Sequence, residues 1–265
     1  MLVHDRPGCH RNDGFRGWRA VAQSTVRPLS VVVFPPVFDE EFENFHLSEE
    51  QKATFADEES PALMIGAYDL LTGNVHNIDK VMEAFKTGGG VNYDKFHPCI
   101  FKGTARFFKP SYKSNLIQKW MPKIPEGKKL LIEGGSLCDV GCGKGLAITL
   151  LASEYTKAKF FGFDIHVPSI EEAKIEAQSA KLDDRLNYEV ASANDYHGEY
   201  DIITFFDSLH DMGDPLSAAS YAKSKLSSKG MVILIEPSAS DEVSENMNTI
   251  GQMYYSFSTM GCIPV

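Results

Sequence analysis

The chain has 265 residues, of which 43% are hydrophobic and 23% charged, as in a globular protein with one large domain or one domain and a smaller piece. Its formal net charge of −10 argues against a broad nucleic-acid surface, because phosphate binding needs clustered Lys and Arg. No apolar run reaches about 18 residues, so no membrane-spanning helix is predicted.

The first 45 residues show little regular pattern, and we interpret residues 1–45 as an irregular or disordered leader. The first 30 residues carry five Arg and two Asp, so a mitochondrial targeting segment is the alternative. The five cysteines are scattered without a C-x-x-C pair, which indicates neither a zinc site nor a disulfide framework. We therefore expect reduced thiols, no metal and a cytoplasmic location.

Residues 46–125 have helical patterns throughout, and we expect a helical N-terminal layer or lid. Ser48 is the expected N-cap of its first helix, and Gly73 in "PALMIGAYDLLTG" the expected end of the next. "NIDKVMEAFKTGGG" predicts another helix, and "SYKSNLIQKWMPKI" a short one stopped by Pro122. "IPEGKK" is the expected domain boundary. The modest basic cluster is interpreted as a solvated helix face: Lys102, Arg106, Lys109 and Lys113.

Beyond Lys129, strands alternate with helices. The predicted strands cover 137–140, 160–164, 186–190, 201–206 and 231–235, and the predicted helices 144–155, 168–181 and 214–227. This alternation predicts a parallel sheet covered on both faces. Ligands of such sheets bind at the carboxyl ends of the strands, so the loops after 140, 164, 190 and 206 should face one site.

The loop after the first of these strands carries glycines at 141, 143 and 145. A nicotinamide fingerprint, G-x-G-x-x-G, would place its third glycine where Leu146 stands, so the fingerprint fails. Gly141 and Gly143 permit close approach of a ligand, and the following helix offers free N–H groups to a carboxylate. Asp139 can hold an ammonium. The loop therefore suits an amino-acid moiety better than a pyrophosphate.

Asp164 ends the next strand, 21 residues beyond Gly143. A carboxylate at this place accepts hydrogen bonds from both hydroxyls of a ribose. The alternative interpretation is a cap of the helix that follows in "HVPSIEEAK".

"LCDVGCGKG", "FFGFDI", "YDIITFFDSLHD" and "KGMVILIEP", in this order, resemble the motifs of class I S-adenosylmethionine-dependent methyltransferases. "FKTGGGVNYDKF" and "YYSFSTMGC" are similar to segments of a family in this class with a winged-helix-like N-terminal region. The resemblance covers about residues 46–265 and implies a Rossmann-like α/β fold in residues 130–265. Five of the seven strands of that fold are recognisable, so we expect a truncated chain with an open edge at strand 231–235.

The resemblance assigns roles to particular positions. The cofactor would be S-adenosyl-L-methionine. The loop after the first strand would hold its methionine moiety, and the loop after the second strand would hold its ribose. Residues after the third strand would contact the adenine, and residues after the fourth would line the cofactor cleft. The implied cofactor-binding residues are Asp139, Gly141, Cys142, Gly143, Asp164, Ile165, Ala193, Asn194, Phe206 and Asp207. Ser192 stands where an acid usually meets the adenine, so Asn194 or Asp195 could substitute for that acid.

Two further segments lie outside these cofactor-binding loops. His210, in "DSLHD", is a candidate general base if the methyl acceptor must lose a proton, and an ordering residue of its loop otherwise. Residues 87–96 are interpreted as a lid with Tyr93 reaching toward the cofactor, and a flexible hinge is the alternative.

We therefore expect an enzyme that transfers a methyl group from S-adenosylmethionine to a small-molecule acceptor. The alternatives are a non-catalytic S-adenosylmethionine-binding or interaction fragment and a nicotinamide-dependent oxidoreductase. A homodimer could form through the N-terminal layer or the open sheet edge.

Overall fold

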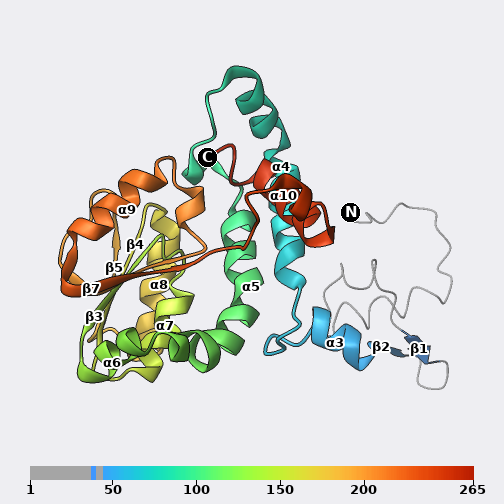
Figure 1. Cartoon of the computed structure of the whole chain (residues 1–265). Helices are drawn as coiled ribbons and strands as arrows, with labels where there is room; N and C mark the ends of the chain where they lie inside the picture. Colours follow the sequence, from blue (N-terminus) through green and yellow to red (C-terminus); the bar gives the residue numbers. More distant parts are fainter. Residues whose placement is uncertain (1–36, 40–43) are drawn as a thin grey trace, which may run out of the picture. The chain divides into compact units, whose positions relative to one another are not determined.

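The structure is a computed structural model that describes residues 37–39 and 44–265, so most of the expected leader lies outside the described residues. The chain divides into two compact units, Met1–Ile65 and Gly66–Val265. The expected helical layer over 46–125 is divided at this point, because the helices from residue 66 onward belong to the same unit as the sheet (Figure 1).

The first unit contains an antiparallel pair of short strands, β1 (Val37–Asp39) and β2 (Asn44–His46), which the sequence pattern did not reveal. Helix α3 (Glu49–Phe55) follows. Ser48 Oγ accepts the Gln51 N–H at 3.2 Å, and Gln51 Oε1 accepts the Ser48 N–H at 3.0 Å. This reciprocal capping box confirms the predicted N-cap.

The second unit begins with a long helix, α4 (Ile65–Thr87), which runs through Gly73. The predicted helix end at Gly73 is therefore wrong. A Cβ at Gly73 would lie 2.9 Å from the backbone nitrogen of Ile100, near the start of helix α5 (Pro98–Asn115). The glycine thus permits close packing of two helices, and sequence alone does not distinguish this from a helix end.

Helix α5 continues into a π-helical turn (Leu116–Trp120) and a 3-10 turn (Met121–Lys123). The predicted short helix is thus the end of a longer one, and Pro122 lies within the 3-10 turn. Helix α6 (Pro125–Glu133) occupies the segment "IPEGKK", where the sequence pattern suggested a domain boundary. Pro125 stands in its first turn, where a missing N–H loses no helical hydrogen bond.

Arg106 on α5 corrects the interpretation of the basic cluster as a solvated face. Its side chain is only 10% exposed, and Nη1 lies 3.3 Å from Asp69 Oδ2 on α4. Lys102 Nζ approaches the other Asp69 oxygen at 3.7 Å. The basic residues therefore help to join two helices.

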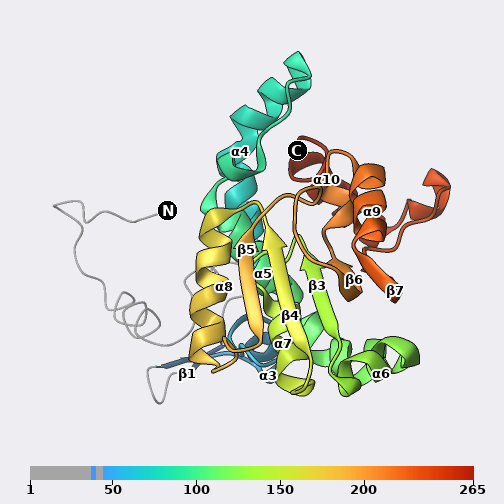
Figure 2. The ribbon, with the colours of Figure 1, turned by 90° about the vertical axis from the view of Figure 1, so that its left-hand side faces the viewer.

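The sheet has five parallel strands in the order β5-β4-β3-β6-β7, which confirms the predicted α/β fold (Figure 2). Its strands are β3 (Ser136–Val140), β4 (Lys159–Asp164), β5 (Leu186–Val190), β6 (Tyr200–Phe206) and β7 (Leu226–Ile235). Among the described residues β7 is an edge strand. Helix α9 (Pro215–Ser224) is shorter than predicted, because β7 begins at Leu226.

Both faces of the sheet are buried. Along β6, Ile202 and Phe206 join a cluster with residues of α5, α6, α7 (Leu146–Glu154) and α8 (Val167–Ser179). The alternate residues Ile203 and Phe205 join a second cluster that includes α9. A doubly covered strand is apolar on both sides, which explains why "IITFF" is apolar except for Thr204, whose hydroxyl donates to Asp139.

After β7 the chain forms a 3-10 turn (Val243–Asn246) and helix α10 (Thr249–Met260). Asn248 caps α10 by accepting the N–H groups of Ile250 and Gly251. None of the helices in the described part of the chain combines the length and hydrophobicity required to cross a membrane.

Candidate active site

The strand order reverses at β3, whose neighbours β4 and β6 continue the chain in opposite directions across the sheet. A ligand crevice forms at such a switch point, beyond the carboxyl ends of the strands. The loop after β3 is fastened to β4, because the N–H groups of Gly141 and Cys142 both donate to Phe163 O, at 2.8 and 3.0 Å. Cys142 itself packs partly buried against the core.

Gly143 and Gly145 have positive φ angles of 53° and 72° but serve different purposes. A Cβ at Gly143 would meet nothing within 4 Å, so this residue faces open space. A Cβ at Gly145 would lie 2.0 Å from the phenolic oxygen of Tyr188 on β5. Gly145 therefore permits close packing of the loop on β5. The nicotinamide fingerprint would place its third glycine one position later, where Leu146 stands.

Asp164 connects this loop with the one after β4. Its Oδ2 accepts the Gly143 N–H at 2.8 Å, and its Oδ1 accepts the His166 N–H at 2.8 Å. The carboxylate therefore also binds the backbone just before α8, but the N-cap of that helix is His166, so the alternative interpretation of Asp164 as the helix cap is wrong. Burial raises the pKa of Asp164 against these hydrogen bonds. Each oxygen retains acceptor capacity, and the neighbouring Ile165 is 53% exposed.

Asp139 and Asp207 make the site acidic together with Asp164. Asp139 is buried and accepts a hydrogen bond from Thr204 Oγ1 at 2.8 Å. Burial, reinforced by the charges of Asp164 and Asp207, raises its pKa to about 8. Burial also raises the pKa of Asp207 to about 6. Carboxyl groups held in this way favour a positively charged ligand, which would stabilise their ionised form.

The end of β6 is fixed by Tyr112 of α5, which the sequence did not single out. Its hydroxyl donates to Asp207 Oδ2 at 2.5 Å, and its ring centroid lies 6.1 Å from that of the buried Phe206. Asp207 has a φ of +51°, a conformation that costs free energy in a residue other than glycine. No spacing in the sequence indicated that Tyr112 would reach across to this strand.

The loop after β5 places the predicted adenine residues at the same edge of the sheet. Ala193 packs partly buried against the cluster that contains Phe163. Ser192 and Asn194 are exposed, and Asn194 Oδ1 accepts a hydrogen bond from Ser217 Oγ at 3.4 Å. The side-chain hydrogen bonds of Ser192 and Asn194 thus lie within the loop and reach α9, and they do not involve the carboxyl groups of the other loops.

His210 lies in the 3-10 turn Leu209–Asp211 after β6, among acidic groups. Its Nδ1 is hydrogen-bonded to Glu236 Oε2, and its Nε2 lies 3.3 Å from Asp211 Oδ1. Hydrogen bonds with Cys262 and Glu236 raise its pKa to about 10. These partners favour the protonated ring near pH 7, and the general-base role of His210 stays a prediction.

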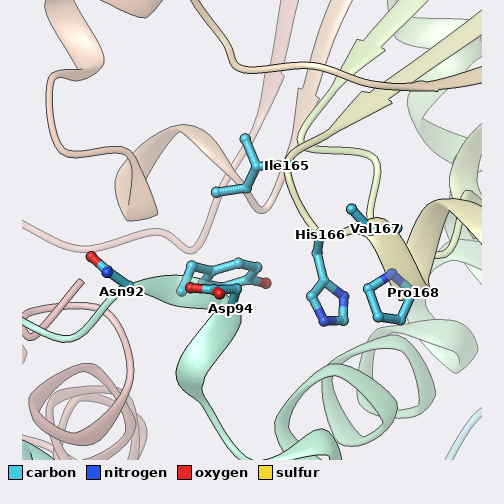
Figure 3. Close-up of a pocket in the computed structure, with 7 residues that line it drawn as sticks. Asn92, Asp94, Ile165, His166, Val167 and Pro168 are labelled. Atoms are coloured by element: carbon cyan, nitrogen blue, oxygen red, sulfur yellow. The ribbon is translucent and has the colours of Figure 1, made fainter.

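The predicted lid covers the loop after β4. Asn92 and Asp94 face Ile165, His166, Val167 and Pro168 across a cavity of about 580 Å³ (Figure 3).

Tyr93, which also lines this cavity, packs edge-on against Phe101 and His166, at 5.1 and 6.3 Å between ring centroids. Burial raises its pKa, and so do the charges of Asp164, Asp211 and Cys262. Tyr93 thus lies near both the Asp164 carboxylate and the group around His210.

Glu236 and Cys262 were not predicted as site residues, although both stand in recognisable motifs, "ILIEP" and "STMGC". Glu236 Oε1 accepts the N–H groups of Ser208 and Leu209, at 3.2 and 2.8 Å. It thereby holds the loop that carries His210. The end of a predicted strand was the signal available for Glu236, while Cys262 is brought to the site by the path of the chain after β7.

Residues 132–262 match the protein family described as methyltransferase domain. The ubiquinone biosynthesis O-methyltransferase of Psychrobacter cryohalolentis is 26% identical over 153 residues, which cover 56% of this chain and 56% of that relative. The mitochondrial ubiquinone biosynthesis O-methyltransferase of Saccharomyces cerevisiae is 27% identical over 169 residues, 63% of this chain and 50% of that relative. The chain spans about half the length of the curated relatives it matches.

Among solved structures, a protein from Nostoc punctiforme assigned as an O-methyltransferase superposes with a TM-score of 0.60 and 19% identity. The superposition covers 89% of this chain and 71% of that one, and at this identity it shows the fold.

The cradle fits the cofactor of this class. Gly143 opens space beside a buried carboxylate, and the acidic groups suit the ammonium and sulfonium charges of the methyl donor. The family match, the fold and this cradle agree, and residues 132–262 form an S-adenosylmethionine-dependent methyltransferase domain of class I.

Proposed function

We propose that this protein transfers the methyl group of S-adenosylmethionine to a hydroxyl oxygen of a small-molecule acceptor. The observation that carries the proposal is the junction of Gly143 and Asp164, where an open glycine and a buried carboxylate meet at the switch point of the sheet. The names of the two relatives, both O-methyltransferases, support oxygen as the methylated atom.

The cofactor would lie across the carboxyl ends of the strands. The open face of Gly143 and the start of α7 would receive the methionine carboxylate, and the acidic group of Asp139 would attract its ammonium. Asp164 would accept hydrogen bonds from the ribose hydroxyls, with Ile165 beside them. Ala193 and Asn194 would border the adenine.

When bound, the cofactor supplies an activated methyl group, so the protein's task is to align the acceptor and exclude water. Tyr93 would cover the cleft from the lid. His210, whose imidazolium is held by Glu236, would place a positive charge where an acceptor hydroxyl approaches the end of β6. A positive charge at this place lowers the pKa of the acceptor hydroxyl, which would give its proton to solvent before it attacks the methyl group as the ionised, better nucleophile. This electrostatic role differs from the general-base role that the sequence suggested for His210.

The two alternative functions receive less support. An oxidoreductase needs a pyrophosphate loop, yet the glycine register and the packing of Gly145 on Tyr188 differ from that fingerprint. A non-catalytic binding fragment would not require the charged group around His210. A cytoplasmic location and a homodimer through the N-terminal layer or the β7 edge stay predictions.

Calorimetric titration with S-adenosylhomocysteine and with NAD tests the cofactor. We expect heat from S-adenosylhomocysteine alone, and binding about tenfold weaker or more in Asp164→Ala, because hydrogen bonds to a charged acceptor are lost. Asp164→Asn keeps one oxygen acceptor and should lose less affinity. Asp183→Ala, on the exposed loop before β5, is the matched control and should bind normally. Heat from NAD without heat from S-adenosylhomocysteine would overturn the proposal.

The acceptor is tested separately, with radiolabelled S-adenosylmethionine and matched sets of phenols, carboxylic acids and amines. Labelled methyl ethers or esters are the expected products. Methylation confined to amines would contradict an oxygen acceptor while leaving cofactor binding intact.

A further inference from the structure

His210, Asp211 and Cys262 bring three potential metal-ligating atoms together at the carboxyl end of the sheet. The imidazole nitrogen, the carboxylate oxygen and the thiol sulfur all lie within 4.8 Å of one another. In a tetrahedral zinc site, ligand atoms about 2.0–2.3 Å from the ion lie about 3.3–3.6 Å apart. The three side chains thus need to close by only about 1 Å to share one ion.

The surroundings of His210 match those of a metal-bound imidazole. Glu236 Oε2 is hydrogen-bonded to Nδ1, which leaves Nε2 to face Asp211 and Cys262. Metal-ligating histidines commonly donate their other N–H to a carboxylate, which fixes the ring and strengthens the ligand. Glu236 is in turn held by the N–H groups of Ser208 and Leu209, so the ring has a defined orientation.

Asp211 supplies an independent observation. Its Oδ1 atom is buried, and no hydrogen-bond partner is recorded for it, although His210 Nε2 lies 3.3 Å away. The Asp211 side chain is 33% exposed, and Oδ1, the oxygen that faces the ring, has the His210 ring nitrogen as its charged neighbour. A metal ion between Oδ1, Nε2 and the Cys262 sulfur would take the place of the imidazolium proton as the positive partner of this oxygen.

We propose that His210, Asp211 and Cys262 form a binding site for one divalent transition-metal ion, with Zn²⁺ as the expected ion. The mixed nitrogen, oxygen and sulfur ligands suit a borderline-soft cation and not Mg²⁺ or Ca²⁺, which prefer oxygen. Because a metal ion binds neutral imidazole and thiolate, its affinity for this site should rise with pH. Three protein ligands leave one tetrahedral position open, as in catalytic zinc sites.

The lid is connected to this site. The Val91 N–H donates to Pro264 O at 2.5 Å, two residues beyond Cys262. Movement of the lid would therefore move the sulfur ligand relative to His210 and Asp211. In the O-methyl transfer proposed above, the ion would supply the positive charge near the acceptor hydroxyl that the imidazolium otherwise provides; only this last role rests on the proposed function.

Cobalt(II) titration of the chelator-treated chain tests the site without any reaction. A Cys9→Ser background removes the thiol beside His10, which could bind metal on its own. We expect one equivalent of Co²⁺ to produce a sulfur-to-cobalt charge-transfer absorption and the intense visible bands of four-coordinate cobalt, both abolished by excess Zn²⁺. Cys262→Ser should lose the charge-transfer absorption, and Cys99→Ser, its matched control, should retain it.

Two further variants keep the test decisive if Cys262→Ser folds poorly. Asp211→Asn should retain the charge-transfer absorption with weaker Co²⁺ affinity, and Glu236→Gln should weaken affinity about 10–100-fold. His197→Gln, which alters an exposed histidine, should change nothing. Absence of the absorption in the parent chain, or its persistence at full strength in folded Cys262→Ser, would overturn the metal site. S-adenosylhomocysteine binding by calorimetry would report on the proposed function independently.

Discussion

The phenolic oxygen of Tyr112 lies 2.5 Å from Asp207 Oδ2, and this hydrogen bond joins helix α5 to the loop at the carboxyl end of β6. Asp207 adopts a φ of +51°, so its carboxylate is held in a strained conformation next to the site. The helical N-terminal part of the second unit thus positions a group of the cleft.

Replacing Tyr112 with Phe should reduce the free energy of unfolding by about 1–2 kcal/mol, since a buried carboxylate loses its donor. The pKa of Asp207, already raised to about 6 by burial, should rise further because the hydrogen bond from Tyr112 lowers it. Urea unfolding at pH 5 and pH 7 measures both effects: the deficit should be larger at pH 7, where Asp207 is ionised.

Tyr221→Phe is the control for this substitution. Its hydroxyl donates to the Tyr196 carbonyl at 2.9 Å, away from the three carboxyl groups of the site. Tyr221→Phe should lower the free energy of unfolding somewhat, and this loss should be the same at pH 5 and at pH 7. An equal pH dependence in both variants would contradict the role of Tyr112 at Asp207.

Gly143→Ala and Gly145→Ala should separate binding from folding. At Gly145 the new methyl group would collide with Tyr188, so we expect a loss of about 2 kcal/mol or more in unfolding free energy. At Gly143 the methyl group meets open space, and the cost is the positive φ alone, about 1 kcal/mol.

Thermal melting and calorimetry with S-adenosylhomocysteine distinguish the two glycine variants. Gly143→Ala should fold and bind the ligand at least about tenfold more weakly, because its methyl group would occupy the cofactor's space. Undiminished binding by folded Gly143→Ala would mean that the cofactor does not approach this residue.

Asp139→Asn should stabilise the ligand-free chain at alkaline pH. Because the folded state raises the Asp139 pKa from 3.8 to about 8, the folded chain binds more protons than the unfolded chain over this range. Stability therefore falls as pH rises from about 4 to 8, and the Asn variant removes this dependence. We expect a gain on the order of 2 kcal/mol at pH 8 and none at pH 4.

Thermal melting of the parent and the variant from pH 4 to pH 8 measures this difference in stability. The substitution isolates the ionisation of Asp139, because the amide oxygen of Asn can still accept the hydrogen bond from the Thr204 hydroxyl. The same variant should discriminate less between S-adenosylmethionine and the uncharged sulfur of S-adenosylhomocysteine. A variant with parental pH dependence would show that Asp139 is ionised in the folded chain throughout this range.

His210→Gln should flatten the stability profile in a different range. The pKa of His210 is raised from 6.5 to about 10, so its contribution is complete below pH 6.5 and is lost as pH rises through 10. Melting temperatures of the parent and the variant should differ most below pH 6.5 and converge near pH 10. A difference that is constant across this range would indicate that the charge of His210 contributes nothing. His197→Gln, an exposed histidine, serves as control.

The sequence by itself determined the α/β class, the five parallel strands and the common edge at which the cofactor loops meet. These features are local: apolar runs give doubly covered strands, and the spacing of Asp139, Gly141 and Gly143 reports on one turn of the chain. The failure of the dinucleotide fingerprint at Leu146 could be predicted for the same reason. Element ends were predicted less accurately: Gly73 lies within a helix because it packs against Ile100, a neighbour that the sequence does not show.

Only the tertiary structure decided which distant groups share the site. Tyr112 and Asp207 are 95 residues apart in the chain, and Cys262 joins His210 from beyond α10. The raised pKa of Asp139 depends on burial and on the charges of Asp164 and Asp207, and that of His210 on hydrogen bonds with Cys262 and Glu236. No local pattern encodes these contacts. The proposed metal ligands come from separate segments of the chain, so no ligand spacing in the sequence could have indicated them.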